Sequence, residues 1–181
     1  MDNVNLNNNV MVDIETLGTA PGSVITEIGA CGIDSNGEYH EFSCRILIND
    51  SIKNGFTMDA DTIKWWFKQG DEARKSLADE SDAITVDVAL DSLVKFFDLF
   101  DKDFRIWCQG SSFDFALIGC YFKRLGRSIP WKFWNERDLR TLKAIHPYAE
   151  KIKFEGVKHT ALSDAKNQFN QLQFIIKKIF A

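Results

Sequence analysis

Long apolar runs and paired cysteines are both missing from this sequence. No stretch of its 181 residues approaches the run of about 20 apolar residues that a membrane-spanning helix needs. The N-terminal residues are rich in asparagine and lack the basic start and apolar run of a signal peptide. The four cysteines form no CxxC pair and lie in apolar stretches, as free thiols of protein cores do. We therefore expect a reduced, cytoplasmic protein that makes no membrane contact.

Repeats and low-complexity linkers are also lacking, so nothing in the sequence indicates a second domain. A chain of 181 residues with 45% apolar composition is long enough to bury one sizeable core. We expect a flexible tail over residues 1–9 and one compact domain over residues 10–181.

The chain has no overall excess of positive charge, since its net charge is −4. This charge argues against a general affinity for polyanions. Residues 123–158 differ from the rest of the chain: they hold ten Lys or Arg against four acidic residues, a local balance of +6. The remainder therefore carries −10. A solvated surface is the usual explanation for such a run. It becomes a phosphate-binding rim only if an active site lies beside it.

Hydrophobic periodicity predicts three strands at the start, followed by helices that alternate with further strands. The expected strands cover residues 10–18, 24–33, 41–48, 104–109 and 131–134. The expected helices lie within residues 57–70, 71–80, 85–100, 114–125, 139–145 and 162–179, with Thr85 as a start signal and Gly126 as a stop signal. This order of elements predicts an α/β fold with a mixed sheet flanked by helices.

Two carboxylates interrupt the first predicted strand, which reads VMVDIETLG. Because side chains alternate along a strand, Asp13 and Glu15 share one face, with their Cα atoms about 6 to 7 Å apart. In α/β sheets, sites gather at strand ends where the strand order changes. The pair therefore indicates a site at the end of this strand.

Further candidates follow at two later positions. Asp114 comes one turn after the strand expected over residues 104–109, where a helix N-cap is the simpler explanation. In the stretch HTALSDA, His159 and Asp164 are five residues apart, a poor spacing for one helical face. We expect His159 in the loop that enters the last helix and Asp164 on its first turns. Taken alone, these two would be a helix cap and a surface residue.

Convergence of these groups would require a cation. Four carboxylates from three elements would repel one another strongly if they met without one. An all-oxygen set with at most one imidazole suits Mg²⁺ or Mn²⁺ better than zinc. Two such ions about 3.5 to 4 Å apart are the usual device for cleaving phosphodiesters. The candidate metal ligands are therefore Asp13, Glu15, Asp114 and Asp164.

The ordered motifs DIET, FD and HTALSDA resemble the three exonuclease motifs of the DEDD superfamily. They match the DEDDh subclass, which has a histidine five residues before the last aspartate, and the resemblance covers roughly residues 10–176. The stretches MVDIETLGTAPGSVITEIGA, DTIKWWFKQGDEAR and ERDLRTL resemble a compact phage and bacterial branch. That branch includes the nuclease domain of exodeoxyribonuclease VIII and ribonuclease AS. The resemblance implies a single ribonuclease H-like domain with 3'-5' exonuclease activity.

The resemblance also implies a role for each candidate. Asp13 would bridge two metal ions, and Glu15 and Asp164 would complete the first ion's site. Asp114 would support the second ion, partly through water. His159 would take the proton from the attacking water.

Substrate contacts are expected on both sides of these motifs. Thr16, Leu17 and Gly18 follow the first motif, and the resemblance implies that they contact the terminal nucleotide. Trp66 and Phe113 are candidates for stacking on a base, with core packing as the alternative for each.

The basic segment adds Arg137 as a candidate, with Arg140 beside it. We expect at least one of the two to lie near phosphate or across a dimer interface. The dimer interface is considered because related compact exonucleases are often homodimers. A homodimer is therefore a possible assembly of this chain.

The sequence as a whole predicts a 3'-5' exonuclease that depends on two Mg²⁺ or Mn²⁺ ions. It would release nucleoside 5'-monophosphates from the 3' ends of single-stranded DNA or RNA, because a buried metal site needs a flexible terminus. Two alternatives stay open: a metal-dependent nucleotide phosphohydrolase, and a catalytically inactive relative that binds nucleic acid. An inactive relative would normally have lost one of the metal carboxylates.

Overall fold

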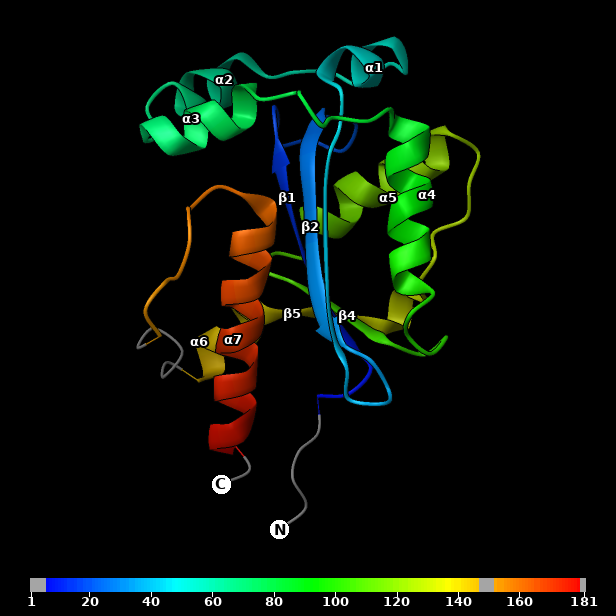
Figure 1. Cartoon of the computed structure of the whole chain (residues 1–181), viewed down its shortest axis with the longest axis vertical. Coiled ribbons are helices and arrows are strands. Elements are labelled where there is room, and N and C mark those ends of the chain that lie inside the picture. The colour runs from blue at the N-terminus through cyan, green and yellow to red at the C-terminus, as the bar shows by residue number, and fades with distance from the viewer. Residues whose placement is uncertain (1–5, 147–151, 180–181) are drawn as a thin grey trace.

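The computed structural model describes residues 6–146 and 152–179, and a five-stranded sheet runs through the middle of this part (Figure 1). The strands are β1 (Asn9–Thr16), β2 (Ile25–Ile33), β3 (Tyr39–Arg45), β4 (Arg105–Cys108) and β5 (Glu136–Asp138). The helices are α1 (Ile48–Lys53), α2 (Ala60–Trp66), α3 (Asp71–Ala78), α4 (Val86–Phe97), α5 (Asp114–Arg124), α6 (Leu139–Ile145) and α7 (Ala161–Ile179). None of the helices described combines the length and apolarity that a membrane crossing requires.

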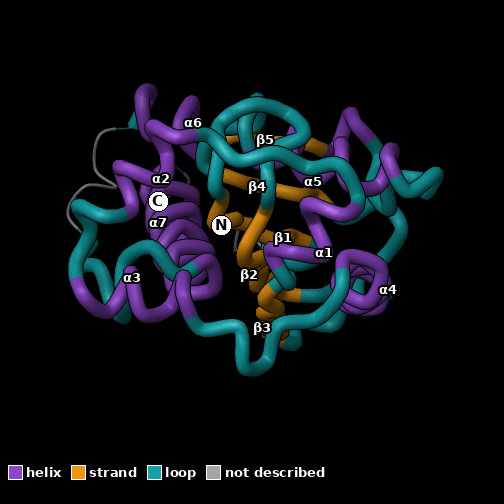
Figure 2. Tube along the Cα trace, turned by 90° about the horizontal axis from the view of Figure 1, so that it is seen from above, coloured by secondary structure: helices purple, strands orange, loops and turns teal. Residues whose placement is uncertain are grey.

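The strand order is β3-β2-β1-β4-β5, which confirms the mixed sheet. β1 pairs antiparallel with β2 and β2 with β3, whereas β1 with β4 and β4 with β5 are parallel. β1 therefore lies where the sheet changes from antiparallel to parallel pairing. Seen from above, α4 and α5 cover one face of the sheet and α7 covers the other (Figure 2).

The two faces of β1 differ in chemistry because its side chains alternate. On one face, Val10, Val12 and Ile14 pack in the larger core with α4 and α5. The opposite face starts with Met11, which packs in a second core with Phe169 and Leu172 of α7. Asp13 and Glu15 continue that second face. The carboxylates thus begin where the apolar contact between β1 and α7 ends.

Two expected elements differ from the structure. The strand expected over residues 41–48 ends at Arg45, and α1 begins at Ile48, where the Glu80 carboxylate accepts a hydrogen bond from the Ile48 amide. The strand expected over residues 131–134 is wrong: a 3-10 turn, η1 (Phe133–Asn135), stands there, and the strand follows as β5. Only Trp131 of that aromatic stretch is buried in the core, so the apolar pattern indicated burial that mostly does not occur.

The start of α4 also differs in detail from the expectation. Thr85 occupies the N-cap position but its side chain makes no capping hydrogen bond. Asp50 of α1 accepts one from the Val86 amide instead, at 2.8 Å. The four cysteines are free, as expected, and Cys31 and Cys108 are buried.

Candidate active site

The carboxylate candidates come from segments that meet at the C-terminal end of β1. This strand end lies beside α2 and α3 in Figure 1. β1 supplies Asp13 and Glu15, the start of α5 supplies Asp114, and the first turns of α7 supply Asp164. Besides burial, the charges of Glu15, Asp114 and Asp164 each raise the pKa of Asp13, and ligand atoms of Glu15 and Asp164 lie within 4.8 Å of each other. The structure thus brings together the four carboxylates that the sequence indicated.

A glycine on β2 allows α7 to approach this strand end. Gly29 is paired with Asp13 across the β1–β2 ladder. A Cβ atom on Gly29 would lie only 2.2 Å from the carbonyl carbon of Ala161 and from the amide of Leu162. Any side chain at Gly29 would therefore push the first turn of α7 away from Asp13. The absence of that side chain is what places Asp164 beside the carboxylates of β1.

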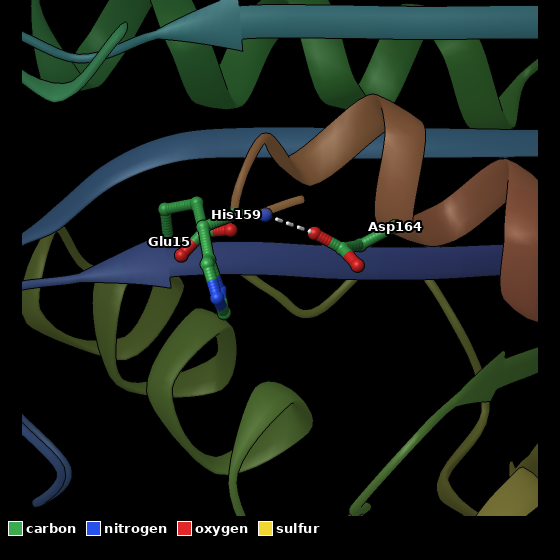
Figure 3. A group of neighbouring side chains, drawn as sticks. All are labelled: Glu15, His159 and Asp164. Atoms are coloured by element: carbon green, nitrogen blue, oxygen red, sulfur yellow. Dashed lines mark hydrogen bonds between the residues drawn. The ribbon is translucent and has the colours of Figure 1, made fainter. Parts of the chain in front are cut away.

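His159 lies in the loop just before α7, as expected, and its backbone has a positive φ of 63°. Its amide donates a 2.8 Å hydrogen bond to Oδ2 of Asp164 (Figure 3). The ligand atoms of Glu15, His159 and Asp164 all lie within 4.8 Å of one another. The five-residue spacing therefore brings the two motif residues together through a loop hydrogen bond and not through one helical face.

The side chains of Trp65 and Trp66 both contact the His159 ring. The ring contacts Trp65 edge to face at a centroid distance of 5.0 Å, and Trp66 at 6.1 Å. Trp66 is buried and its indole N–H donates to the Thr16 carbonyl at 2.8 Å, so α2 is tied to the end of β1. Trp65 is 43% exposed. The imidazole therefore stands against an aromatic wall at the edge of the site.

Asp114 is the first residue of α5 and is buried, and Phe113 holds the N-cap position. The N-cap explanation for Asp114 is therefore wrong. Burial raises the pKa of Asp114 to about 7, although hydrogen bonds from its own amide, the Cys108 thiol and the backbone of Ile14 oppose the rise, as does the charge of Arg140. Its carboxylate is thus tethered to β4 and β1, the two parallel strands at the centre of the sheet.

The electrostatics of the cluster favour either protonation of the carboxylates or a bound cation. Burial, followed by the charges of Asp114, Glu15 and Asp164, raises the pKa of Asp13 well above its ordinary range. Burial and the charges of Asp164, Glu27 and Asp114 raise the pKa of Glu15 to about 9. The donors are carboxylate oxygens with one imidazole, a set that fits Mg²⁺ or Mn²⁺. A bound cation would allow all four carboxylates to ionise together.

Without divalent cations, the free energy of unfolding should fall as pH rises from 4.5, the ordinary pKa of Glu15, toward 9, its pKa in the fold. The folded state holds this proton more tightly than the unfolded chain, so the stabilisation is complete below pH 4.5 and is lost as pH passes about 9. Thermal melts across this interval, with EDTA and with Mn²⁺, test this. Mn²⁺ should raise Tm most at the alkaline end, and Glu15→Gln should flatten the pH dependence in EDTA. A Tm that responds neither to pH nor to Mn²⁺ would contradict a cation site.

Two further residues of the site were missed by sequence reasoning. Gln168 donates from Nε2 to Oδ1 of Asp13 at 2.6 Å. Its signal was its position four residues after Asp164, on the same helical face. Glu27 is buried and paired with Glu15 across the ladder, and the Ser43 hydroxyl donates to it at 3.3 Å. Its signal was a charged residue within an apolar strand.

A pocket of about 540 Å³ opens beside the carboxylates. Its lining includes Glu15 together with three residues that the sequence indicated for substrate contact: Thr16, Trp66 and Phe113. Trp65 and Asp59 complete much of its wall. Ligand pockets of this size that combine aromatic walls with a few polar groups are typical small-molecule sites. The volume suits one nucleoside.

The other expected substrate residues lie outside that lining. The Leu17 amide already donates to the Val24 carbonyl, and Gly18 is packed against Ser23. The guanidinium of Arg137 donates to the carbonyls of Trp134 and Glu136. None of these three residues therefore lines the pocket.

Of the two arginines that the sequence indicated, Arg140 is the one that lies near the carboxylates. Its guanidinium donates to the Gln109 carbonyl at 2.9 Å and lies next to Gly110, and its charge acts on Asp114. Lys143 donates to the Gln109 side chain at 3.0 Å. Part of the basic segment thus borders the carboxylate cluster.

Comparison with known proteins agrees with this geometry. Residues 8–176 match the 3'-5' exoribonuclease Rv2179c-like domain. The exodeoxyribonuclease of Enterobacteria phage T4 is 27% identical over 159 residues, which cover 72% of this chain and 68% of that protein.

Solved structures share the fold at low identity. The nuclease domain of 3'hExo, a DEDDh family member bound to rAMP, superposes with a TM-score of 0.58 at 11% identity, over 93% of this chain and 91% of that domain. Exonuclease I of E. coli in complex with a dT13 oligonucleotide gives a TM-score of 0.60 at 16% identity, over 94% of this chain but only 42% of that protein. These likenesses confirm the ribonuclease H-like fold. Because the family match extends over nearly the whole chain, this chain belongs to the Rv2179c-like 3'-5' exoribonuclease domain family.

Proposed function

We propose that this member of the family is a two-metal exonuclease that removes nucleoside 5'-monophosphates from the 3' ends of single-stranded nucleic acid. The observation that carries the proposal is the convergence of four carboxylates and His159 beside a pocket large enough to hold a nucleoside. A site that holds one terminal nucleoside next to its phosphate would cut at a chain end and not within a chain.

Asp13, Glu15, Asp114 and Asp164 would together hold the two ions. We assign Asp13 to both ions, and Glu15 and Asp164 would complete the ligands of the first while Asp114 would serve the second. Bound Mg²⁺ or Mn²⁺ would supply the positive charge that stabilises the attacking and leaving oxygens of the phosphate. No Lys or Arg among the described residues forms a salt bridge with these four carboxylates. Burial raises the pKa of Asp114 and of Asp164, and the charges of Arg140 and Lys158 oppose that rise only in part.

His159 is assigned the proton transfer. An imidazole nitrogen would accept the proton of the attacking water, and the hydrogen bond from the His159 amide to Asp164 fixes the loop that carries it. Trp65 and Trp66 limit the positions that the ring can take. The proposed base and one proposed metal ligand, Asp164, thus lie on one short segment, residues 159–164.

The pocket is assigned to the terminal nucleoside. The exposed face of Trp65 and the side chain of Phe113 offer aromatic surface against which a base can stack. Trp66, in contrast, is occupied by its bond to Thr16, so its part is to shape the pocket. Arg140 and Lys143 border the site where the preceding phosphates would pass.

The sugar of the substrate is the open part of this proposal. The family is described for RNA, whereas the relative from phage T4 is named for DNA. We propose activity on both, because the site residues identified above act on the phosphate and the base and not on the 2'-hydroxyl. A homodimer is also proposed from the family resemblance, and sedimentation would test it.

End-labelled oligonucleotides provide the test of polarity. On 5'-labelled single strands of DNA and RNA, Mg²⁺ or Mn²⁺ should give a ladder of shortened products, and on 3'-labelled strands the labelled mononucleotide should appear first. EDTA and a 3'-phosphate block should each stop the reaction, and blunt duplexes should be cut more slowly because their ends must fray.

Three outcomes would point elsewhere. Equal digestion of 3'-blocked strands, or shortening from the 5' end, would overturn the polarity. Phosphate release from mononucleotides without any ladder would favour the phosphohydrolase. Metal-independent binding without cleavage would favour the inactive nucleic-acid-binding relative.

A further inference from the structure

The hydrogen bond between Gln168 and Asp13 joins α7 to the central carboxylate of the site. Gln168 is 7% exposed and lies one helical turn after Asp164, and its Nε2 donates to Oδ1 of Asp13 at 2.6 Å. It is a residue of the second helical turn that reaches back to β1. The contact spans 155 positions in the sequence.

The donor is neutral, and this matters for a site that has to bind cations. Burial and three neighbouring carboxylates disfavour the charge on Asp13, and the amide of Gln168 is the group that favours it. A lysine in the same place would favour the carboxylate equally but would add a positive charge that repels incoming metal. An amide stabilises the ionised carboxylate and leaves the attraction for cations intact.

The orientation of the amide is set by the same contact. Oε1 of Gln168 is buried and has no hydrogen-bond partner among the described residues. The reversed amide would put Oε1 against Oδ1, so that two acceptors would face each other. The side chain therefore leaves one buried acceptor unsatisfied, an arrangement that is rare unless it serves a function.

We propose that Gln168 is a positioning residue, which fixes the Asp13 carboxylate in the rotamer that binds metal. One lone pair of Oδ1 is used by the amide, and the other lone pair and both of those on Oδ2 stay free for cations. This inference rests on the assignment of Asp13 to the metal site in the proposed function. It adds a residue that makes no direct contact with metal or substrate.

The test compares Gln168→Met and Gln168→Leu with Gln173→Met, a matched change on the same helix. Both variants at Gln168 lack the donor but differ in shape, so a shared effect reports the lost hydrogen bond. We expect them to bind Mn²⁺ about 10- to 100-fold more weakly in the absence of substrate, as loss of an outer-shell partner typically does. Calorimetry or electron paramagnetic resonance of Mn²⁺ measures this without catalysis, and circular dichroism confirms folding.

Kinetics separate positioning from a general loss of structure. At limiting Mn²⁺ the Gln168 variants should show reduced kcat with an unchanged KM for a 5'-labelled oligonucleotide, and excess Mn²⁺ should restore most of the rate. Gln173→Met should behave as the original chain in each assay. Unchanged Mn²⁺ affinity in both Gln168 variants would overturn the inference. Weakened Mn²⁺ binding in a chain that cuts no oligonucleotide would instead support the inference and reject the proposed function.

Discussion

Asp13→Asn should lower nuclease activity by several orders of magnitude while the chain stays folded. The carboxylate of Asp13 is assigned to both metal ions, and asparagine keeps its shape but removes the charge. The same substitution removes one of the mutually repelling carboxylates, so Tm in EDTA should rise. Asp13→Asn should therefore lower the activity and raise the Tm of the metal-free protein.

Single-turnover cleavage of a 5'-labelled oligonucleotide, with melts in EDTA and in Mn²⁺, measures both effects. Asp98→Asn is the matched control, because Asp98 is an exposed aspartate at the end of α4. It should leave the rate and the response of Tm to Mn²⁺ unchanged. Full activity in Asp13→Asn would reject the two-metal assignment.

Removal of the His159 imidazole should reduce kcat by about 10²- to 10⁴-fold, the usual contribution of a general base. Affinity for Mn²⁺ and for the oligonucleotide should persist, because His159 is assigned to the water and not to the metal. Its positive φ of 63° affects the choice of variant. Alanine is strained there, whereas asparagine tolerates this backbone conformation, so His159→Asn is the cleaner substitution.

His159→Ala and His159→Asn should thus share the loss in kcat, and only the alanine variant should also lose stability. His146→Asn serves as the control, because His146 lies at the end of α6. If Mn²⁺ binding collapses in both His159 variants, the imidazole is a metal ligand. That result is sterically feasible, since one of its ring nitrogens lies within 4.8 Å of ligand atoms of Glu15 and Asp164.

The sequence predicted those parts of the molecule that depend on local pattern. Alternation along β1 placed Asp13 and Glu15 on one face, and the spacing of apolar residues predicted α7 and its buried stripe, including Phe169 and Leu172. The histidine and the last aspartate were likewise expected in a loop and on a first helical turn. These features follow from the periods of strand and helix and need no knowledge of partners.

Features that depend on how elements pack were predicted less well. Both adjacent tryptophans line the pocket, but which of them is exposed depends on the rotation of α2 about its axis. The bond from Trp66 to the Thr16 carbonyl leaves Trp65 as the more exposed one. The basic segment was located by composition, but Arg137 turns to nearby carbonyls whereas Arg140 reaches the site. The roles of Gln168 and Glu27 at the site depend on contacts with other segments of the chain, which the sequence pattern does not show.

The close approach of α7 over Gly29 also determines when, during synthesis, the site comes into existence. A nascent chain that ends after α6 carries Asp13, Glu15 and Asp114 but neither His159 nor Asp164. A contact that spans 155 residues cannot form before both of its ends have left the ribosome. In the proposed function, the capacity to cut nucleic acid therefore arises only when α7 docks on β2.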